Sequence, residues 1–229
     1  QGVTHGDFNE DGFPDLYVCN VGGNRFYENN GDGTFTEIAQ QTNTAGDEWS
    51  MSSLLADLDG DGFSDLYVVN YLKADQVLAR SCRKNGEPLT CAPTLFDGER
   101  DRVYRNLGNG RFVEETDSAG LVQQEGKGLG IVAMNVTGNG RLNVFVANDT
   151  TANQYYNNLT QPGGPLRFEE LGLVSGLAMS ASGVMQACMG VAAGDANSDG
   201  LTDLFITNFI MDYNTLYLQQ PDGTFSDET

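Results

Sequence analysis

The sequence is poor in several residue types, and each shortage limits what the chain can be. Its 229 residues include one histidine, one tryptophan and only 12 basic residues against 32 acidic ones, for a formal net charge of −20. No stretch approaches the roughly 18 apolar residues that a membrane-spanning helix needs. Such acidity repels phosphate backbones and anionic membranes, so we expect no nucleic-acid partner and no direct membrane insertion. The sequence begins at Gln1 without an initiator methionine or leader, which we interpret as a processed or excised piece.

Catalytic signatures are also lacking. The patterns GxSxG, HExxH and CxxC do not occur. The sole histidine, His5, could act as a general base, but a lone histidine in a strand is more commonly packed or hydrogen-bonded. The glycine-rich run from Gly126 to Gly130 has no strand-loop-helix context that would cradle a phosphate. We therefore expect a protein without catalytic activity.

What the sequence does contain is a repeated block rich in glycine, asparagine and aspartate. Four copies begin GVTHGDFNEDGFPDLYVCN, SSLLADLDGDGFSDLYVVN, GIVAMNVTGNGRLNVFVAN and GVAAGDANSDGLTDLFITN. Each copy reads as a small-residue strand, a polar loop, an apolar strand, a strand with aromatic residues and a short last strand. Four antiparallel strands at a period near 50 residues are typical of one propeller blade. We predict an all-β β-propeller of four-stranded antiparallel blades, at approximately residues 1–45, 46–120, 121–180 and 181–229.

The unequal spacing of the copies predicts insertions, of which the largest is residues 71–101 in the second blade. Cys82 and Cys91 bracket a short polar segment within it, SCRKNGEPLTC, and we predict a disulfide-stapled surface loop in an oxidising compartment. Cys19 and Cys188 lie in apolar, strand-like contexts, where a buried free thiol is the commoner outcome.

The loop between the first two strands predicts a metal site. Alternate carboxylates in a tightly curled loop supply the oxygens that calcium needs, a glycine at position 6 permits the curl, and position 7 adds a backbone carbonyl. The predicted ligands, at positions 1, 3, 5, 7 and 9, are Asp7, Asn9, Asp11, Phe13 and Asp15 in the first copy, Asp57, Asp59, Asp61, Phe63 and Asp65 in the second, and Asp195, Asn197, Asp199, Leu201 and Asp203 in the fourth. We therefore expect about three Ca²⁺ ions.

These loops admit two other interpretations. An EF-hand needs a glutamate at position 12 between two helices, whereas position 12 of the second copy is Val68 in a strand-like run. Asp, Asn and Gly also form turns without any metal, but charges at the same positions in three copies favour a metal. The third copy has neutral side chains at these positions, so we expect weak calcium binding there or none; they are Asn135, Thr137, Asn139 and Asn143.

Three segments resemble FG-GAP or VCBS-type repeat propellers, especially the cartilage acidic protein group and its bacterial relatives. They are DGFPDLYV (Asp11 to Val18), NNGDGTF (Asn29 to Phe35) and DGTF (Asp222 to Phe225). The resemblance covers essentially the whole chain. It implies a propeller, commonly seven-bladed as in the integrin α-subunit head, with calcium in loops between the first two strands of a blade. It also implies an extracellular, cell-surface or periplasmic location. Four copies then form either an arc of a larger ring, which we favour, or a ring that closes alone.

The sequence thus predicts a non-catalytic, calcium-binding module that binds a protein or glycan partner through its insertions and outer loops. Two alternatives stay open. The propeller could be a structural subunit of a larger surface or periplasmic assembly. It could also be a polysaccharide-active enzyme of the propeller type, which would need an open metal position or clustered acids at the channel mouth.

Overall fold

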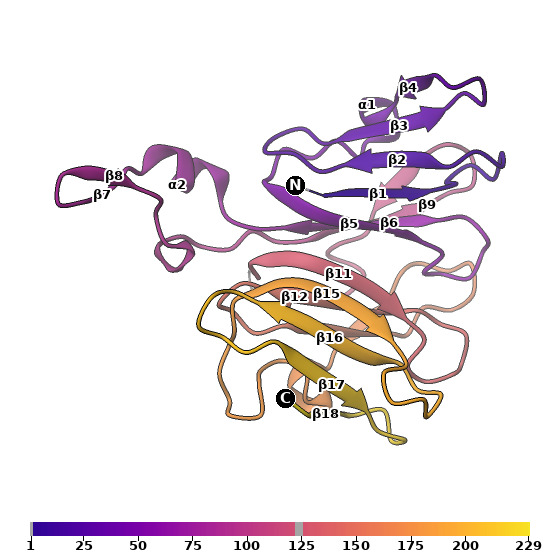
Figure 1. The fold of residues 1–229 in the computed structure, drawn as a ribbon. Helices are drawn as coiled ribbons and strands as arrows, with labels where there is room; N and C mark the ends of the chain where they lie inside the picture. The colour runs from indigo at the N-terminus through magenta and orange to yellow at the C-terminus, as the bar shows by residue number, and fades with distance from the viewer. Residues whose placement is uncertain (1, 122–125) are drawn as a thin grey trace.

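The computed structural model of the chain describes residues 2–121 and 126–229 (Figure 1). Residue 1 and residues 122–125, which belong to the predicted first and third blades, lie outside this description. Among the described residues, four four-stranded antiparallel sheets and one two-stranded hairpin account for all the named strands. The predicted all-β architecture of four-stranded blades is confirmed.

The four sheets follow one another along the chain, and each adds its strands in sequence order from one edge to the other. They are β1 (Val3–Gly6), β2 (Asp15–Val18), β3 (Arg25–Asn29) and β4 (Phe35–Glu37); β5 (Ser50–Ala56), β6 (Asp65–Asn70), β9 (Arg102–Asn106) and β10 (Phe112–Glu114); β11 (Gly128–Met134), β12 (Asn143–Asn148), β13 (Gln154–Asn158) and β14 (Phe168–Glu170); and β15 (Cys188–Gly194), β16 (Asp203–Asn208), β17 (Thr215–Gln219) and β18 (Phe225–Asp227). Short helices α1 (Ala39–Thr42) and α3 (Gly172–Ser175) follow β4 and β14.

The first strands of the four sheets pack beside one another. β1 packs beside β5, β5 beside β11, and β11 beside β15, so the sheets stand as consecutive blades with β1 and β15 at opposite ends of the series (Figure 1). Three apolar clusters fill the three spaces between successive blades. The core of the protein is therefore divided among the blade junctions.

The second strand of an inner blade shows why the sequence produces this arrangement. All six residues of β6, DLYVVN, are buried. Leu66 and Val68 belong to the cluster shared with the first blade, while Tyr67 and Val69 belong to the cluster shared with the third. A strand covered on both faces reads as a continuous apolar run rather than an alternating one. The apolar run that follows each polar loop is thus the centre of a blade.

Residues 71–101 leave the second blade between β6 and β9 and form an arm that projects from the body (Figure 1). The arm contains α2 (Ala74–Ala79), the hairpin of β7 (Cys82–Lys84) with β8 (Glu87–Leu89), and the 3₁₀ turn η1 (Pro93–Leu95). A disulfide joins Cys82 to Cys91, with their Cα atoms 5.3 Å apart. This cross-link restricts the chain entropy of an arm whose helix buries no residue.

The other two cysteines, Cys19 and Cys188, are free and buried. Each lies in an apolar cluster between two blades. Burial raises the pKa of both thiols, that of Cys188 to about 12, so both are protonated and act as small apolar groups.

Candidate calcium-binding loops

The candidate loops connect the first and second strands of each blade and share one backbone path. Positions 4 and 6 have left-handed backbone in every copy. Position 6 is always glycine, as the prediction of a sharp turn requires, and Gly62 has a φ of 98°. Position 4 is glycine in the second and third loops but Glu10 and Ser198 in the first and fourth, with φ of 60° and 64°. Because non-glycine residues rarely adopt this conformation, the first and fourth loops carry local strain.

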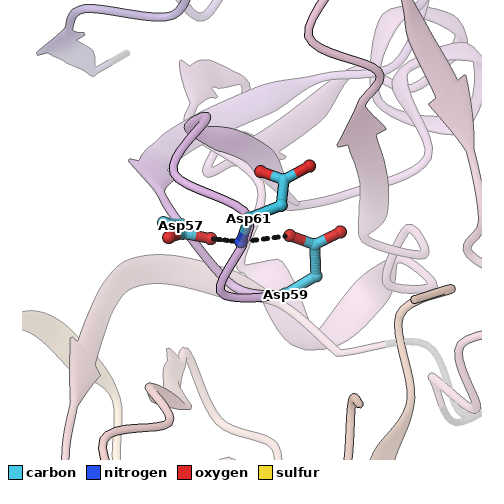
Figure 2. A group of neighbouring side chains, drawn as sticks. All are labelled: Asp57, Asp59 and Asp61. Carbon is cyan, nitrogen blue, oxygen red and sulfur yellow. Dashed lines mark hydrogen bonds between the residues drawn. The ribbon is translucent and has the colours of Figure 1, made fainter. Parts of the chain in front are cut away.

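In the second loop the carboxylates turn inward and accept hydrogen bonds from the backbone of their own loop. Asp57 accepts from Asp61 N at 3.1 Å and from Gly62 N at 3.0 Å. Asp59 also accepts from Asp61 N, at 3.1 Å (Figure 2). The carboxylates of Asp57, Asp59 and Asp61 offer ligand oxygens that all lie within 4.8 Å of one another. The three predicted carboxylates at positions 1, 3 and 5 are therefore brought together.

Asp59 is the most unusual member of this group. It is only 3% exposed, and its Oδ2 atom is buried without a hydrogen-bond partner. Burial, with a smaller contribution from the nearby charge of Asp61, raises the pKa of this carboxyl to about 6. A buried carboxylate without a partner is unfavourable unless a cation or a proton neutralises it. The site therefore has the electrostatic character of a cation site.

Asp59 is buried because another blade covers the loop. The link between β13 and β14 of the third blade, residues 159–167, packs on the second loop and donates a hydrogen bond from Gly163 N to Asp59 O at 2.8 Å. Asn158 adds a second bond, from its Nδ2 to Leu58 O at 2.8 Å. The second candidate loop is thus held against the next blade.

The first and fourth loops differ from the second at position 3, where asparagine replaces aspartate. Asn9 donates from Nδ2 to Asp11 Oδ2 at 3.0 Å, and Asn197 donates likewise to Asp199 at 2.8 Å. In the second loop this position holds a carboxylate, which has no proton to donate when ionised. The asparagine loops therefore give the position 5 carboxylate a side-chain hydrogen bond that the second loop does not provide.

The position 9 residues have a structural role that the sequence did not predict, because each aspartate there accepts hydrogen bonds from two backbone N–H groups. The two oxygens of Asp65 accept hydrogen bonds from Leu58 N at 2.9 Å and Asn106 N at 2.8 Å. Asp15 and Asp203 make the same pair of bonds in their blades. Burial raises the pKa of Asp65 to about 8. Each of these carboxylates fixes the loop to the third strand of its blade, and none belongs to the carboxylate group described above.

The position 7 residues donate their backbone N–H to the position 5 carboxylate in all three predicted loops. Phe13 N lies 2.9 Å from Asp11 Oδ1, Phe63 N 2.9 Å from Asp61 Oδ1, and Leu201 N 2.8 Å from its counterpart. The expected ligand role of their carbonyl oxygens stays a prediction.

The third loop keeps the curl and lacks the charge. Gly138 and Gly140 have positive φ values of 66° and 82°. Asn139 still accepts a bond from Arg141 N, at 2.8 Å. At position 9, Asn143 accepts from Val136 N only at 3.4 Å. The curled backbone of these loops can therefore form without any carboxylate.

His5 does not behave as the sequence suggested. It is exposed on β1, so of the two expected roles, packed or hydrogen-bonded, the packed one is wrong. Its strand packs beside β5 of the second blade.

Comparison with known proteins agrees with the repeat. Residues 7–68 match the family described as the FG-GAP-like repeat. This segment begins at position 1 of the first loop and ends in β6, so it spans the first two candidate loops. The resemblance to FG-GAP repeats is confirmed, and no curated protein sequence matches the chain.

Three solved structures resemble the fold at low similarity. The Vibrio cholerae biofilm matrix protein Bap1 is 16% identical over 97% of this chain and 29% of its own length, with a TM-score of 0.43. An Agrocybe aegerita lectin that recognises non-reducing terminal N-acetylglucosamine is 17% identical over 100% and 65%, with a TM-score of 0.36. The exotype rhamnogalacturonan lyase YesX is 16% identical over 89% and 38%, with a TM-score of 0.44. The chain spans less than two thirds of each of these proteins.

Proposed function

We propose that the chain is a calcium-stabilised, non-catalytic binding module that acts outside the cell or in the periplasm. The observation that carries the calcium assignment is the second loop, where Asp57, Asp59 and Asp61 converge and one oxygen of Asp59 is buried without a partner. Calcium prefers such carboxylate oxygens in a curled loop, and it would supply the positive charge that this group lacks. The first and fourth loops have one fewer carboxylate and bind more weakly.

Calcium in the second loop would stabilise the fold and would not take part in catalysis. The second loop contacts the third blade through Gly163 and Asn158, so neutralising the loop also strengthens a blade junction. A ligand that binds only the folded state stabilises it in proportion to the logarithm of ligand concentration. The module is therefore more rigid in a calcium-rich compartment.

The arm is the part of the molecule best suited to bind a partner. A hollow of about 430 Å³ lies where the arm leaves the body, and its lining includes Trp49, Tyr71, Phe96 and Arg80. Trp49 and Tyr71 meet edge to face with ring centroids 5.4 Å apart, and Arg80 lies over Phe96. Four of the chain's 12 basic residues fall within residues 73–84. Aromatic faces and arginine are the groups that recur in protein recognition sites, and aromatic rings also stack on sugars.

Isothermal titration calorimetry of the whole chain with Ca²⁺, and separately with Mg²⁺, tests the metal assignment. We expect calcium binding whose strongest site is lost in Asp59→Ala and kept in the matched control Asn139→Ala from the third loop. Absence of calcium heat, together with an unchanged melting temperature in calcium, would refute the assignment.

The binding role is tested separately. Glycan and protein arrays are probed with the intact chain and with Arg80→Ala, a change that leaves the calcium loops untouched. Binding that the substitution weakens supports the arm as the recognition surface. Turnover of a polysaccharide that is lost in His5→Ala would instead establish the enzyme alternative.

A further inference from the structure

The arm differs from the rest of the chain in its charge. Residues 71–101 contain five basic and five acidic residues, whereas the other residues include seven basic and 27 acidic ones, so the body carries the whole net charge of −20. The arm projects from that body (Figure 1). Because exposed charges more than ~8 Å apart are largely screened at physiological ionic strength, a ligand on the arm is affected mainly by the charges nearest to it.

The hollow at the base of the arm is lined differently from the other hollows of the molecule. Arg80 is the one charged residue among the described residues that line it. Four other hollows each have one or two acidic residues in their lining and no basic one; these residues are Glu170, Asp195, Asp203, Asp212 and Asp227. In a chain with 32 acidic residues, a carboxylate that enters the arm hollow would thus meet an opposite charge and no like charge in the lining.

Arg80 is held in place at the wall of this hollow. Its Nη1 atom donates a hydrogen bond to Leu95 O at 3.2 Å, and its guanidinium carbon lies 5.8 Å from the centre of the Phe96 ring. A guanidinium has five N–H donors, so these contacts leave donors for a ligand. Arginine commonly binds a carboxylate through two parallel hydrogen bonds. The geometry therefore suits an anion of this shape.

The aromatic residues of the hollow offer apolar ring surfaces, because their polar atoms already have partners. Trp49 Nε1 donates to Met51 Sδ at 3.1 Å, and Tyr71 OH donates to Asp149 Oδ2 at 2.5 Å. The face of an aromatic ring is electron-rich and attracts the C–H groups on the apolar face of a sugar ring. A ligand with both a carboxylate and a sugar ring would match these surfaces and Arg80 together.

The hollow is also preformed, since the arm is fastened to the body. Lys127, just before β11 of the third blade, donates from Nζ to Pro93 O at 3.0 Å. The bond from Tyr71 to Asp149 joins the base of the arm to the same blade. The disulfide between Cys82 and Cys91, which both line the hollow, constrains the opposite wall. A preformed site loses less conformational entropy when a ligand binds.

We propose that the arm hollow binds a uronate residue of an anionic polysaccharide, an inference that rests on the proposed binding role of the arm. Arg80 would pair with the carboxylate, and the rings of Trp49 and Tyr71 would pack on the apolar face of the sugar. Ser81 and Thr90, which also line the hollow, carry hydroxyl groups that pair with sugar hydroxyls. An acidic peptide has carboxylates but neither the sugar ring nor its hydroxyls, so it matches fewer of these groups.

Calorimetry with matched tetrasaccharides tests the proposal. Tetrasaccharides of hyaluronan, alginate and polygalacturonate are each compared with the same compound after its carboxylates have been reduced to alcohols, at one fixed calcium concentration. We expect the intact chain to bind at least one uronate form about tenfold more tightly than its reduced form, and Arg80→Ala to lose that preference. The control Arg111→Ala removes an equal charge from the exposed link between β9 and β10 and should keep the preference.

Three results would overturn the proposal and leave a general binding role of the arm standing. They are equal affinity for the uronate and reduced forms, a carboxylate preference that persists in Arg80→Ala, and tighter binding of hexaglutamate than of every uronate tetrasaccharide. Binding of no tetrasaccharide also overturns it, and the array experiment then decides separately whether the arm binds another partner. Circular dichroism verifies that each variant is folded, and Arg80→Gln replaces Arg80→Ala if that variant is not.

Discussion

The second and third loops have nearly the same backbone path and very different electrostatics. Both turn through left-handed glycines at positions 4 and 6. The second brings together three carboxylates and buries one of them, and the third presents Asn135, Thr137 and Asn139 at the same positions. The curl is thus a property of the repeat, and the charge is a property of the individual blade. The backbone curl and the number of carboxylates therefore vary independently from blade to blade.

The sharpest test of this comparison places the three carboxylates of the second loop at the same positions of the third loop. The triple variant Asn135→Asp, Thr137→Asp, Asn139→Asp should add one calcium site to the chain, because the curl needed to direct the carboxylates is already present. Calorimetry should show the stoichiometry rise by one ion. An unchanged stoichiometry in a folded variant would show that the curl alone does not position ligands.

The position 9 residues should differ in their effect on stability. Asp65→Ala leaves the buried N–H groups of Leu58 and Asn106 without an acceptor and should lower the free energy of unfolding by about 3 kcal/mol. Asn143→Ala removes a longer bond and should cost about 1 kcal/mol. Urea unfolding in the presence of chelator measures both. Equal losses would contradict the assigned role of Asp65.

The calcium-free protein should lose stability as pH rises. The folded-state pKa of Asp59 is about 6 and that of Asp65 about 8, both above the roughly 3.9 of an unfolded aspartate. Between the unfolded pKa of roughly 3.9 and the folded pKa of each residue, the folded state therefore binds more protons than the unfolded state. The free energy of unfolding falls by about 2 kcal/mol or more as the pH rises through this window.

Thermal melts in chelator at pH 5 and pH 8 check this dependence. Calcium should offset the loss and stabilise more strongly at pH 8, since it binds the ionised carboxylates. Asp59→Asn gives the second loop the asparagine that the first and fourth loops have at position 3, and it should flatten part of the slope. Stability that rises with pH in chelator would contradict the prediction.

The smallest expected effect concerns the shared curl. Gly62→Ala and Gly140→Ala place a side chain on a left-handed residue with open space around the new Cβ, so only backbone strain changes. Each should cost about 1 kcal/mol in chelator, as measured by urea unfolding. A large difference between the two would show that the curl depends on the carboxylates after all.

Much of the fold could be predicted because its signals are short in range. The run DLYVVN marks the blade centre, and residues 71–101 stand out as an insertion because they interrupt a repeat. The convergence of positions 1, 3 and 5 also follows from local geometry, since the bonds that curl the loop join residues two to five apart. Left-handed Glu10 and Ser198 were not predicted, because nothing in the residue type marks them.

The sequence by itself determined the repeat, the curl of each loop and which loops carry charge, because all three depend on neighbours along the chain. Only the tertiary structure decided that Asp59 is buried and that Asp65 fastens its loop to β9. Each of these depends on contact with another strand or blade, as in the bond between Leu58 and Asn158, which are 100 residues apart. Burial is set by what packs on a residue, and in a propeller that is the next blade.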